Sequence, residues 1–443
     1  MGPEIKKTLV LSLPIVVGQL GQMLMSVVDN IMVGKLGAQA LAASSIANSL
    51  FLLIMVVGFG LTVAVTPLTA IAFGAGRDEE CGIVLRQGIL LNLFFGILLC
   101  CITILLSECI QFLNQPHEIV GPASLYMKVL GFSMLPLMLF QSYRQFAEGV
   151  SFLKPAMIIT LLANFVNILA NWIFIYGNLG VTPLGLTGAG IATISSRTFM
   201  AIALMIIIRK SSKMQRFDPT LNYRKIDLPM MRRLLAIGIP AGFQYFFEVS
   251  AFAASAIMVG WMGTIALAAH QIALNLASIS FMVAMGISSA ATIRVSTAVG
   301  RRDVHGTRLA GFSAAILCAL FMASAGLVFI LFRFFLPTLY VSEKEVIDIS
   351  AALLVIVAFF QISDGIQSIG LGILRGITDM KIPTLITLAA YWLMGLPSGY
   401  FMAFKLDMGI YGVWYGLLIS LTASGLFMMI RFNSKSQKQV YLH

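Results

Sequence analysis

The sequence has few charged residues. Asp, Glu, Lys and Arg together make up 11% of its 443 positions, whereas hydrophobic residues make up 59%. A soluble domain carries about 25% charged residues, so the composition excludes a soluble fold and indicates an outer surface that faces lipid. Within a bilayer only helices and closed barrels satisfy every backbone hydrogen bond. Long apolar runs without an alternating polar pattern exclude the barrel and predict an all-α integral membrane protein.

Histidine and cysteine are scarce as well. The chain has four histidines and five cysteines, and they lack the spacing of metal ligands. An integral-membrane glycosyltransferase or protease would need clustered Asp, His or Ser motifs, so the composition argues against an enzyme, and we expect no cofactor. The net charge of +11 does not indicate nucleic-acid binding, because the basic residues lie between hydrophobic runs rather than on one patch.

Twelve apolar runs of membrane-spanning length follow one another along the chain. About 20 apolar residues are needed to cross a bilayer as a helix. The runs cover residues 8–33, 45–74, 85–107, 122–148, 155–176, 187–208, 231–259, 267–293, 308–332, 347–376, 382–404 and 408–430. The longest polar stretch lies between the sixth and seventh runs. We therefore expect an N-terminal lobe over residues 1–208, a basic cytoplasmic linker over 209–228 and a C-terminal lobe over 229–443.

Lysine and arginine are distributed unevenly between the two sides that these spans predict. Most of them, including Arg375, fall in the N-terminus, the linker, the even-numbered loops and the C-terminus. The opposite side holds only Lys35, Lys128, Arg333, Lys344 and Lys405. Because cytoplasmic segments are enriched in Lys and Arg, both termini are predicted to be cytoplasmic. The first run is long enough to be a span rather than a cleavable signal, so we expect a multi-pass protein of the plasma (inner) membrane.

The two halves of the chain repeat each other. One constant shift places Pro14 on Pro240 and Gly60 on Gly286, and it also aligns short identical motifs such as Met-Val-Gly and Leu-Ala-Ala. Because each half contains six spans, both halves enter the membrane in the same direction. A parallel repeat of this kind has a pseudo-twofold axis along the membrane normal, and rocking of two six-helix lobes about that axis would give alternating access.

Apart from acids within two residues of the end of a run, three acidic residues lie inside predicted spans: Asp29 in the first, Glu248 in the seventh and Asp364 in the tenth. An acid in mid-membrane costs about 2.5–3.5 kcal/mol on insertion scales, so it persists only beside a polar cavity or a partner. Polar residues accompany the acids at helical spacing, and others share one face of the fifth span. The candidate cavity residues are Asp29, Gln22, Asn164, Asn167, Gln244, Tyr245, Gln361 and Gln367, together with Phe281 on an apolar part of the wall. Asn171 shares the face of Asn164 and Asn167 in the fifth span.

This pattern predicts a cation site. Carboxylate and amide oxygens bind hard ions, so Glu248 and Asp364 could hold Na+, and a buried carboxyl group could instead carry a proton. A structural role is the alternative, because a buried acid can pair with an arginine. Arg197, in the sixth span, is available to one of the three acids. His270 stands alone at the start of the eighth span and is interpreted as structural.

Seven segments spread over the chain carry a family resemblance. They are LSLPIVVGQLGQMLMSVVDNIMVGKLG from Leu11, NWIFIYG from Asn171, GLTGAGIAT from Gly185, GIPAGFQYFFEVSAF from Gly238, ALAAHQI from Ala266, SSAATIRVSTAVGRRD from Ser288 and GILRGITDMKIP from Gly372. With these motifs the whole chain resembles the MATE (multidrug and toxic compound extrusion) transporters, and in particular their NorM branch.

The resemblance implies a secondary active antiporter that exports organic, mostly cationic compounds in exchange for Na+ or H+. In NorM-type members the acids that match Glu248 and Asp364 form the cation site of the second lobe, and the acid that matches Asp29 serves the first lobe. The presence of all three acids favours Na+ and leaves H+ open. Some relatives have a tyrosine near the position of Phe281, and phenylalanine keeps a cation–π contact there but offers no hydroxyl ligand.

A lipid-linked oligosaccharide flippase of the same superfamily is the alternative function. Its anionic substrates would call for a basic cavity, and the sequence offers only Arg197 against three acids. The expected partners are therefore small organic cations, Na+ or H+ and the lipid bilayer, with no nucleic acid. We expect the protein to act as a monomer.

Overall fold

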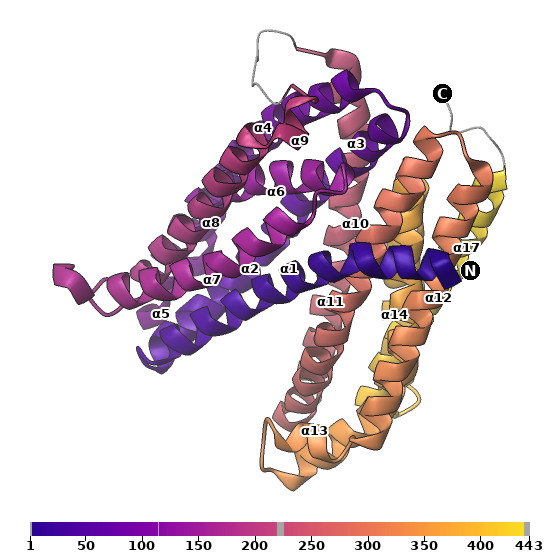
Figure 1. Ribbon diagram of the computed structural model, residues 1–443. Coiled ribbons are helices and arrows are strands. Elements are labelled where there is room, and N and C mark those ends of the chain that lie inside the picture. The colour runs from indigo at the N-terminus through magenta and orange to yellow at the C-terminus, as the bar shows by residue number, and fades with distance from the viewer. Residues whose placement is uncertain (1, 114, 219–225, 438–443) are drawn as a thin grey trace. The chain divides into compact units, whose positions relative to one another are not determined.

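The chain is built of membrane-length helices. The computed structural model describes residues 2–113, 115–218 and 226–437, and no β-strand occurs within these ranges. Twelve helical segments are long and apolar enough to span a membrane, which confirms the twelve predicted spans. Figure 1 labels the helices in chain order. The central part of the predicted linker, residues 219–225, lies outside the described residues.

The spans of the first half are α1 (Gly2–Gly34), α2 (Ala38–Thr62) with α3 (Val65–Gly74), α4 (Asp78–Glu108) with η1 (Cys109–Phe112), α5 (His117–Phe132) with α6 (Met134–Gly149), α7 (Lys154–Phe174) and α8 (Gly185–Lys210). Those of the second half are α10 (Leu228–Gly260), α11 (Thr264–Gly300), α12 (Val304–Leu331), α14 (Lys344–Gly376), α15 (Lys381–Leu388) with η3 (Ala389–Gly395) and α16 (Leu396–Phe404), and α17 (Ile410–Gln437). Three short segments lie between spans: η2 (Asn178–Gly180), α9 (Ser212–Gln215) and α13 (Phe335–Thr338).

The sequence repeat recurs in the backbone. Gly37, immediately before α2, has φ 112° and ψ 171°. Gly263, which the shift between the halves aligns with Gly37, lies immediately before α11 and has φ 109° and ψ 172°. Residues with a Cβ rarely adopt such a positive φ. Both turns therefore depend on glycine, and the two halves enter their second span in the same way.

Packing divides the chain into two compact units. The N-unit comprises Val17–Gly242, and the C-unit comprises Met1–Val16 together with Phe243–His443. Both α1 and α10 are therefore divided between the two units. The boundary in α1, after Val16, and the boundary in α10, after Gly242, are corresponding positions of the sequence repeat. The lobes expected from the sequence place all of α1 in the N-terminal half and α10, apart from its first residue, in the C-terminal half. In the structure the first part of α1 belongs to the C-unit and the first part of α10 belongs to the N-unit.

The first turns of α1 are fastened within the C-unit by Arg294 of α11. The Arg294 guanidinium forms an ion pair with the Glu4 carboxylate and donates to the Thr8 hydroxyl. It also donates to the backbone carbonyl of Glu4 at 2.8 Å. Only 10% of the Arg294 side chain is exposed, and a buried charge of this kind needs its partner. The contact helps to hold the start of α1 in the C-unit.

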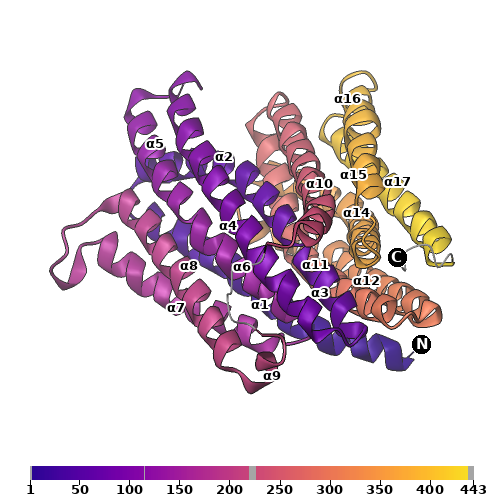
Figure 2. The ribbon, with the colours of Figure 1, turned by 90° about the horizontal axis from the view of Figure 1, so that it is seen from above.

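Helix α14 packs against α11, α12 and α17 within the C-unit (Figure 1 and Figure 2). Three hydroxyl groups of α11, spaced one helical turn apart, donate to three backbone carbonyls of α14 with the same spacing. They are Ser288 to Ser368 (2.6 Å), Thr292 to Gly372 (2.8 Å) and Ser296 to Gly376 (2.9 Å). Small residues permit such a close approach of membrane helices. This hydroxyl ladder fixes α14, which carries Asp364, against α11.

Large apolar side chains are exposed on the outer faces of the helices. Phe94 on α4 and Phe165 on α7 are 61% and 71% exposed, and Leu320 on α12 and Leu393 in η3 are 63% and 73% exposed. Extended apolar surface of this kind is unfavourable in water and favourable against acyl chains. Together with the twelve apolar spans, it identifies a multi-pass membrane protein.

Candidate functional site

Two of the predicted acids meet inside the C-unit. Glu248 lies on α10 and Asp364 on α14, and Asp364 is 7% exposed. The two carboxylates interact electrostatically. Glu248 Oε2 also accepts a hydrogen bond of 2.6 Å from Gln244 Nε2, one helical turn earlier. The arrangement places two acidic side chains within electrostatic reach of each other, of which Asp364 is buried and Glu248 is partly buried.

Tyr391 extends this group of polar side chains. It lies in the π-helical segment η3, and its hydroxyl donates to Gln367 Oε1 at 2.8 Å. The hydroxyl also interacts electrostatically with Glu248 and Asp364. Short π-helical segments often occur at functional sites. We call Gln244, Glu248, Asp364, Gln367 and Tyr391 the carboxylate cluster.

Sequence reasoning missed Tyr391, although a signal was present. Thr384 and Thr387 precede it at helical spacing, about two turns and one turn earlier, and both are buried in the structure. The three residues thus share one face of the eleventh span. This face contains no carboxylate, the feature by which the sequence marks the other candidate site residues.

Gln361 is the remaining predicted polar residue of α14. It is fully buried, and neither its amide oxygen nor its amide nitrogen bonds to any described residue. The Gln244 oxygen and the Gln367 nitrogen are likewise unpaired within the described part of the chain. Buried polar atoms normally have a partner, whether protein, water or ion. These amide groups therefore retain the capacity to bind a ligand.

A small cavity adjoins Glu248. It has a volume of about 30 Å³, enough for roughly one water molecule. Three helices line it: α10 through Tyr245 and Glu248, α11 through Phe281, Met285, Ser288 and Ser289, and α14 through Ser368, Leu371 and Arg375. The structure therefore brings the predicted residues Tyr245, Glu248 and Phe281 to one site.

Arg375 is the cavity residue that the sequence interpretation misplaced. The predicted run 347–376 contains it, but the count of basic residues groups it with the cytoplasmic loop; in the structure it is 8% exposed and lies inside α14. Its Nη2 donates to the Tyr245 hydroxyl at 3.2 Å, and the guanidinium carbon lies 5.7 Å from the centre of the Tyr245 ring. Spacing could have located it, because Arg375 follows Asp364 by close to three helical turns and thus shares its face.

Asp29 has a separate polar environment in the N-unit. Its Oδ1 accepts a hydrogen bond of 2.6 Å from Asn171 Nδ2 on α7, and the same nitrogen lies 3.2 Å from Asn167 Oδ1. The polar face predicted for the fifth span therefore reaches the acid of the first span. Asn164 is used differently, because its amide nitrogen donates to the backbone carbonyls of Gly21 and Thr160. Gln22 is half-buried on α1.

Arg197 was considered as an ion-pair partner for one of the acids. In the structure it is held by Ser133, whose hydroxyl accepts from Nη1 at 2.5 Å, and its guanidinium carbon lies 5.4 Å from the centre of the Phe51 ring. It interacts electrostatically with Asp29, but it forms an ion pair with no carboxylate among the described residues. A simple Asp–Arg pair therefore does not account for Asp29.

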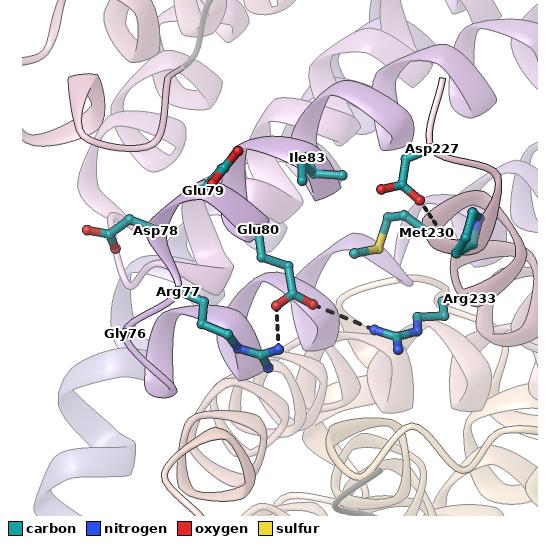
Figure 3. Close-up of a pocket in the computed structure, with 10 residues that line it drawn as sticks. Gly76, Arg77, Asp78, Glu79, Glu80, Ile83, Asp227, Met230 and Arg233 are labelled. Carbon is teal, nitrogen blue, oxygen red and sulfur yellow. Dashed lines mark hydrogen bonds and ion pairs between the residues drawn. The ribbon is translucent and has the colours of Figure 1, made fainter. Parts of the chain in front are cut away.

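A larger cavity lies in the N-unit, at the start of α4 and α10 (Figure 3). It measures about 670 Å³ and has a strongly charged lining. Glu80 pairs with Arg77 at 2.6 Å and with Arg233 at 3.6 Å, and Asp227 caps α10 by accepting from the Met230 backbone nitrogen at 2.9 Å. These charges are used within the fold, so we assign them no role in transport.

Comparison with known proteins follows the same division into halves. The MatE family model matches residues 14–173 and 240–401. The multidrug resistance protein MdtK of Yersinia pseudotuberculosis is 35% identical over 434 residues, which cover 97% of this chain and 95% of that protein. The multidrug resistance protein NorM of Aliivibrio fischeri is 32% identical over 432 residues, which cover 97% and 94%.

Solved structures agree on the fold. The eukaryotic MATE transporter AtDTX14 has a TM-score of 0.88 at 21% sequence identity, and the match covers 99% of this chain and 98% of that one. The outward-facing conformation of a multidrug resistance MATE family transporter also has a TM-score of 0.88 at 21% identity, over 98% and 97%. Since the family model covers most of both halves and the relatives MdtK and NorM match nearly the whole chain, this protein belongs to the MATE family of transporters.

Proposed function

We propose that the protein is a secondary active antiporter that exports organic, mostly cationic compounds in exchange for Na+ or H+. The observation that carries the proposal is the pair of acids formed by Glu248, which is partly buried, and Asp364, which is buried; their carboxylates interact electrostatically. Two negative charges in a membrane interior are unfavourable unless cations or protons compensate them. The names of the relatives, multidrug resistance proteins MdtK and NorM, support drugs as the exported compounds.

The chemistry of the carboxylate cluster favours Na+ over H+ as the coupling ion. A proton would need only the carboxyl groups. A hard cation prefers several oxygen ligands, and Glu248 and Asp364 are accompanied by amide oxygens and the Tyr391 hydroxyl. The unpaired oxygens of Gln244 and Gln361 are available in the same unit.

Exchange can arise from competition for this negative charge. In an outward-open state the ion binds at Glu248 and Asp364 and lowers the affinity for the organic cation, which leaves. The ion-bound protein then converts to an inward-open state, where a cytoplasmic organic cation displaces the ion. This cycle requires only that each ligand has a different affinity for the two states. Asp29, oriented by Asn171, would provide a second contact for an organic cation or a proton.

The distribution of lysine and arginine supports an orientation with both termini cytoplasmic, and we propose that the protein lies in the plasma (inner) membrane. We propose a monomer without a cofactor. A lipid-linked oligosaccharide flippase has less support, because its anionic substrate would meet the two acids of the carboxylate cluster beside the single arginine Arg375. Transport of such a lipid without any cation dependence would favour the flippase.

The proposal is tested by dye efflux from right-side-out membrane vesicles under an imposed Na+ or pH gradient. We expect Glu248→Gln and Asp364→Asn to slow gradient-driven efflux at least about tenfold. Each variant removes one of the two carboxylates proposed to contact the ion, and losing one partner of such a charged contact costs about 2–5 kcal/mol. Asp348→Asn is the matched control, since Asp348 is an acid on the same helix as Asp364 and lies outside the cluster. Undiminished efflux in both cluster variants would refute the assignment, and comparison of the two gradients identifies the ion.

A further inference from the structure

Arg375 places a positive charge beside a site that is proposed to bind cations. Its side chain lines the same cavity as Glu248, and the two groups interact electrostatically. Arginine stays protonated in proteins, so this charge cannot be removed by loss of a proton. An organic cation or Na+ entering the cluster therefore always encounters it.

The guanidinium is held close to the acids without pairing with them. Its carbon lies 5.7 Å from the centre of the Tyr245 ring, and it donates to the Tyr245 hydroxyl. Tyr245 lies one helical turn before Glu248. The Arg375 Nε is buried and bonds to no described residue. In the described ranges, no carboxylate lies within ion-pair distance of Arg375. The charge is therefore close enough to act on Glu248 and is not neutralised by it.

We propose that Arg375 sets the cation affinity of the carboxylate cluster, weakening the binding of Na+ and organic cations enough for each to be released in every cycle. This inference rests on the proposed antiport function and names the residue that adjusts the affinity of the cluster for cations. Two carboxylates in a buried, low-dielectric place would bind a cation tightly, and slow release would then limit exchange. The fixed charge of Arg375 offsets part of that attraction. Tyr245 is the positioning residue that keeps the guanidinium from collapsing onto Glu248.

The size of the effect follows from Coulomb's law. A unit charge about 5–10 Å away changes the affinity of a cation by roughly 10- to 300-fold at an effective dielectric constant of about 20. We therefore expect Arg375→Gln to bind Na+ at least about tenfold more tightly than the wild type. In transport, the same variant should show a lower KM for Na+ and a lower maximal rate. Arg375→Lys keeps the charge and should retain an affinity close to that of the wild type.

The test is isothermal titration of NaCl into the purified full-length protein in nanodiscs, with choline chloride as the ionic-strength control. Arg431→Gln is the matched control, since it removes the same charge from the same unit but from a residue whose partner is Asp379, at 2.7 Å. It should leave the Na+ affinity unchanged. If Arg375→Gln is not monodisperse, Arg375→Met is measured instead, because its side chain can still pack on Tyr245.

The outcomes separate this inference from the function on which it rests. If Glu248→Gln leaves Na+ binding intact, the proposed ion site is wrong. If Glu248→Gln abolishes binding and a folded, neutral Arg375 variant binds Na+ no more tightly than the wild type, only the role of Arg375 is refuted. Tighter binding by the neutral variant, with restoration by lysine, supports it. If Arg431→Gln increases the Na+ affinity as much as the neutral Arg375 variant does, the net charge of the protein alone is responsible, and the proposal is overturned.

Discussion

Replacement of Gly372 by alanine should separate α11 from α14. A Cβ at this position would lie 2.6 Å from the backbone carbonyl oxygen of Ser288, and a backbone atom cannot move aside as a flexible side chain can. The helices must then shift apart by several tenths of an ångström. The hydroxyl ladder, with bonds of 2.6, 2.8 and 2.9 Å, runs through the same contact and would lengthen with it.

The expected loss has two parts. Overpacking of a close contact costs about 1–3 kcal/mol, and each interhelical hydrogen bond in a membrane protein contributes about 0.6 kcal/mol. Together these predict a loss of about 2–5 kcal/mol for Gly372→Ala. If the whole of this loss appears in the unfolding rate, the half-life at a fixed temperature falls by roughly 30- to 5,000-fold.

Because large membrane proteins commonly unfold irreversibly, the assay is the rate at which monodisperse protein is lost on heating, followed by size-exclusion chromatography. Gly260→Ala is the matched control. Gly260 is helical, belongs to the same unit, and would place its Cβ in open space with no atom within 4 Å. A Gly372→Ala protein that survives heating as well as Gly260→Ala would refute the argument that α11 and α14 are held together by this close approach.

Two further variants test contacts in the C-unit. Glu4→Gln should destabilise the protein by about 1–3 kcal/mol, because the buried Arg294 charge loses its carboxylate. A double-mutant cycle with Arg294→Gln in the same heating assay should show that the two effects are coupled. Additive effects would show that the two side chains do not stabilise the protein through their contact. Tyr391→Phe removes the donor to Gln367 and should slow Na+-driven efflux about fivefold, equivalent to about 1 kcal/mol. Efflux at the wild-type rate would exclude a role of the Tyr391 hydroxyl in transport.

The twelve spans and the three buried acids could be predicted from the sequence because both are properties of single segments. A run of about 20 apolar residues has few alternatives to crossing the bilayer, and an acid within such a run is conspicuous. The break between α2 and α3 at residues 63–64 does not show in the hydropathy of the segment; its sequence signal is Pro67, which cannot donate a hydrogen bond to the carbonyl of Val63. The π-helical turn η3 does not show in the hydropathy either, because it changes hydrogen bonding but not composition.

The parts of the site that escaped prediction depend on contacts between helices. Arg375 has the sequence context of a loop residue, since it stands just before a turn, and only its packing on Tyr245 shows that it belongs to the cavity. The same limit applies to α1. Nothing in its composition distinguishes residues 2–16 from 17–34 as members of different units, because that division is made by the Glu4–Arg294 contact and its neighbours.

The division of α1 and α10 has a consequence for how such a chain could be cut or have arisen. If the gene is split between α9 and α10, neither product encodes a complete compact unit, because each lacks a helical segment that only the other supplies. Co-expressed fragments should therefore assemble, whereas each fragment alone should leave part of its core uncovered and be degraded. A half-length ancestor would have completed its core only by exchanging first helices with a second copy of itself, as domain-swapped dimers do. Fusion of the two genes would have made that exchange permanent.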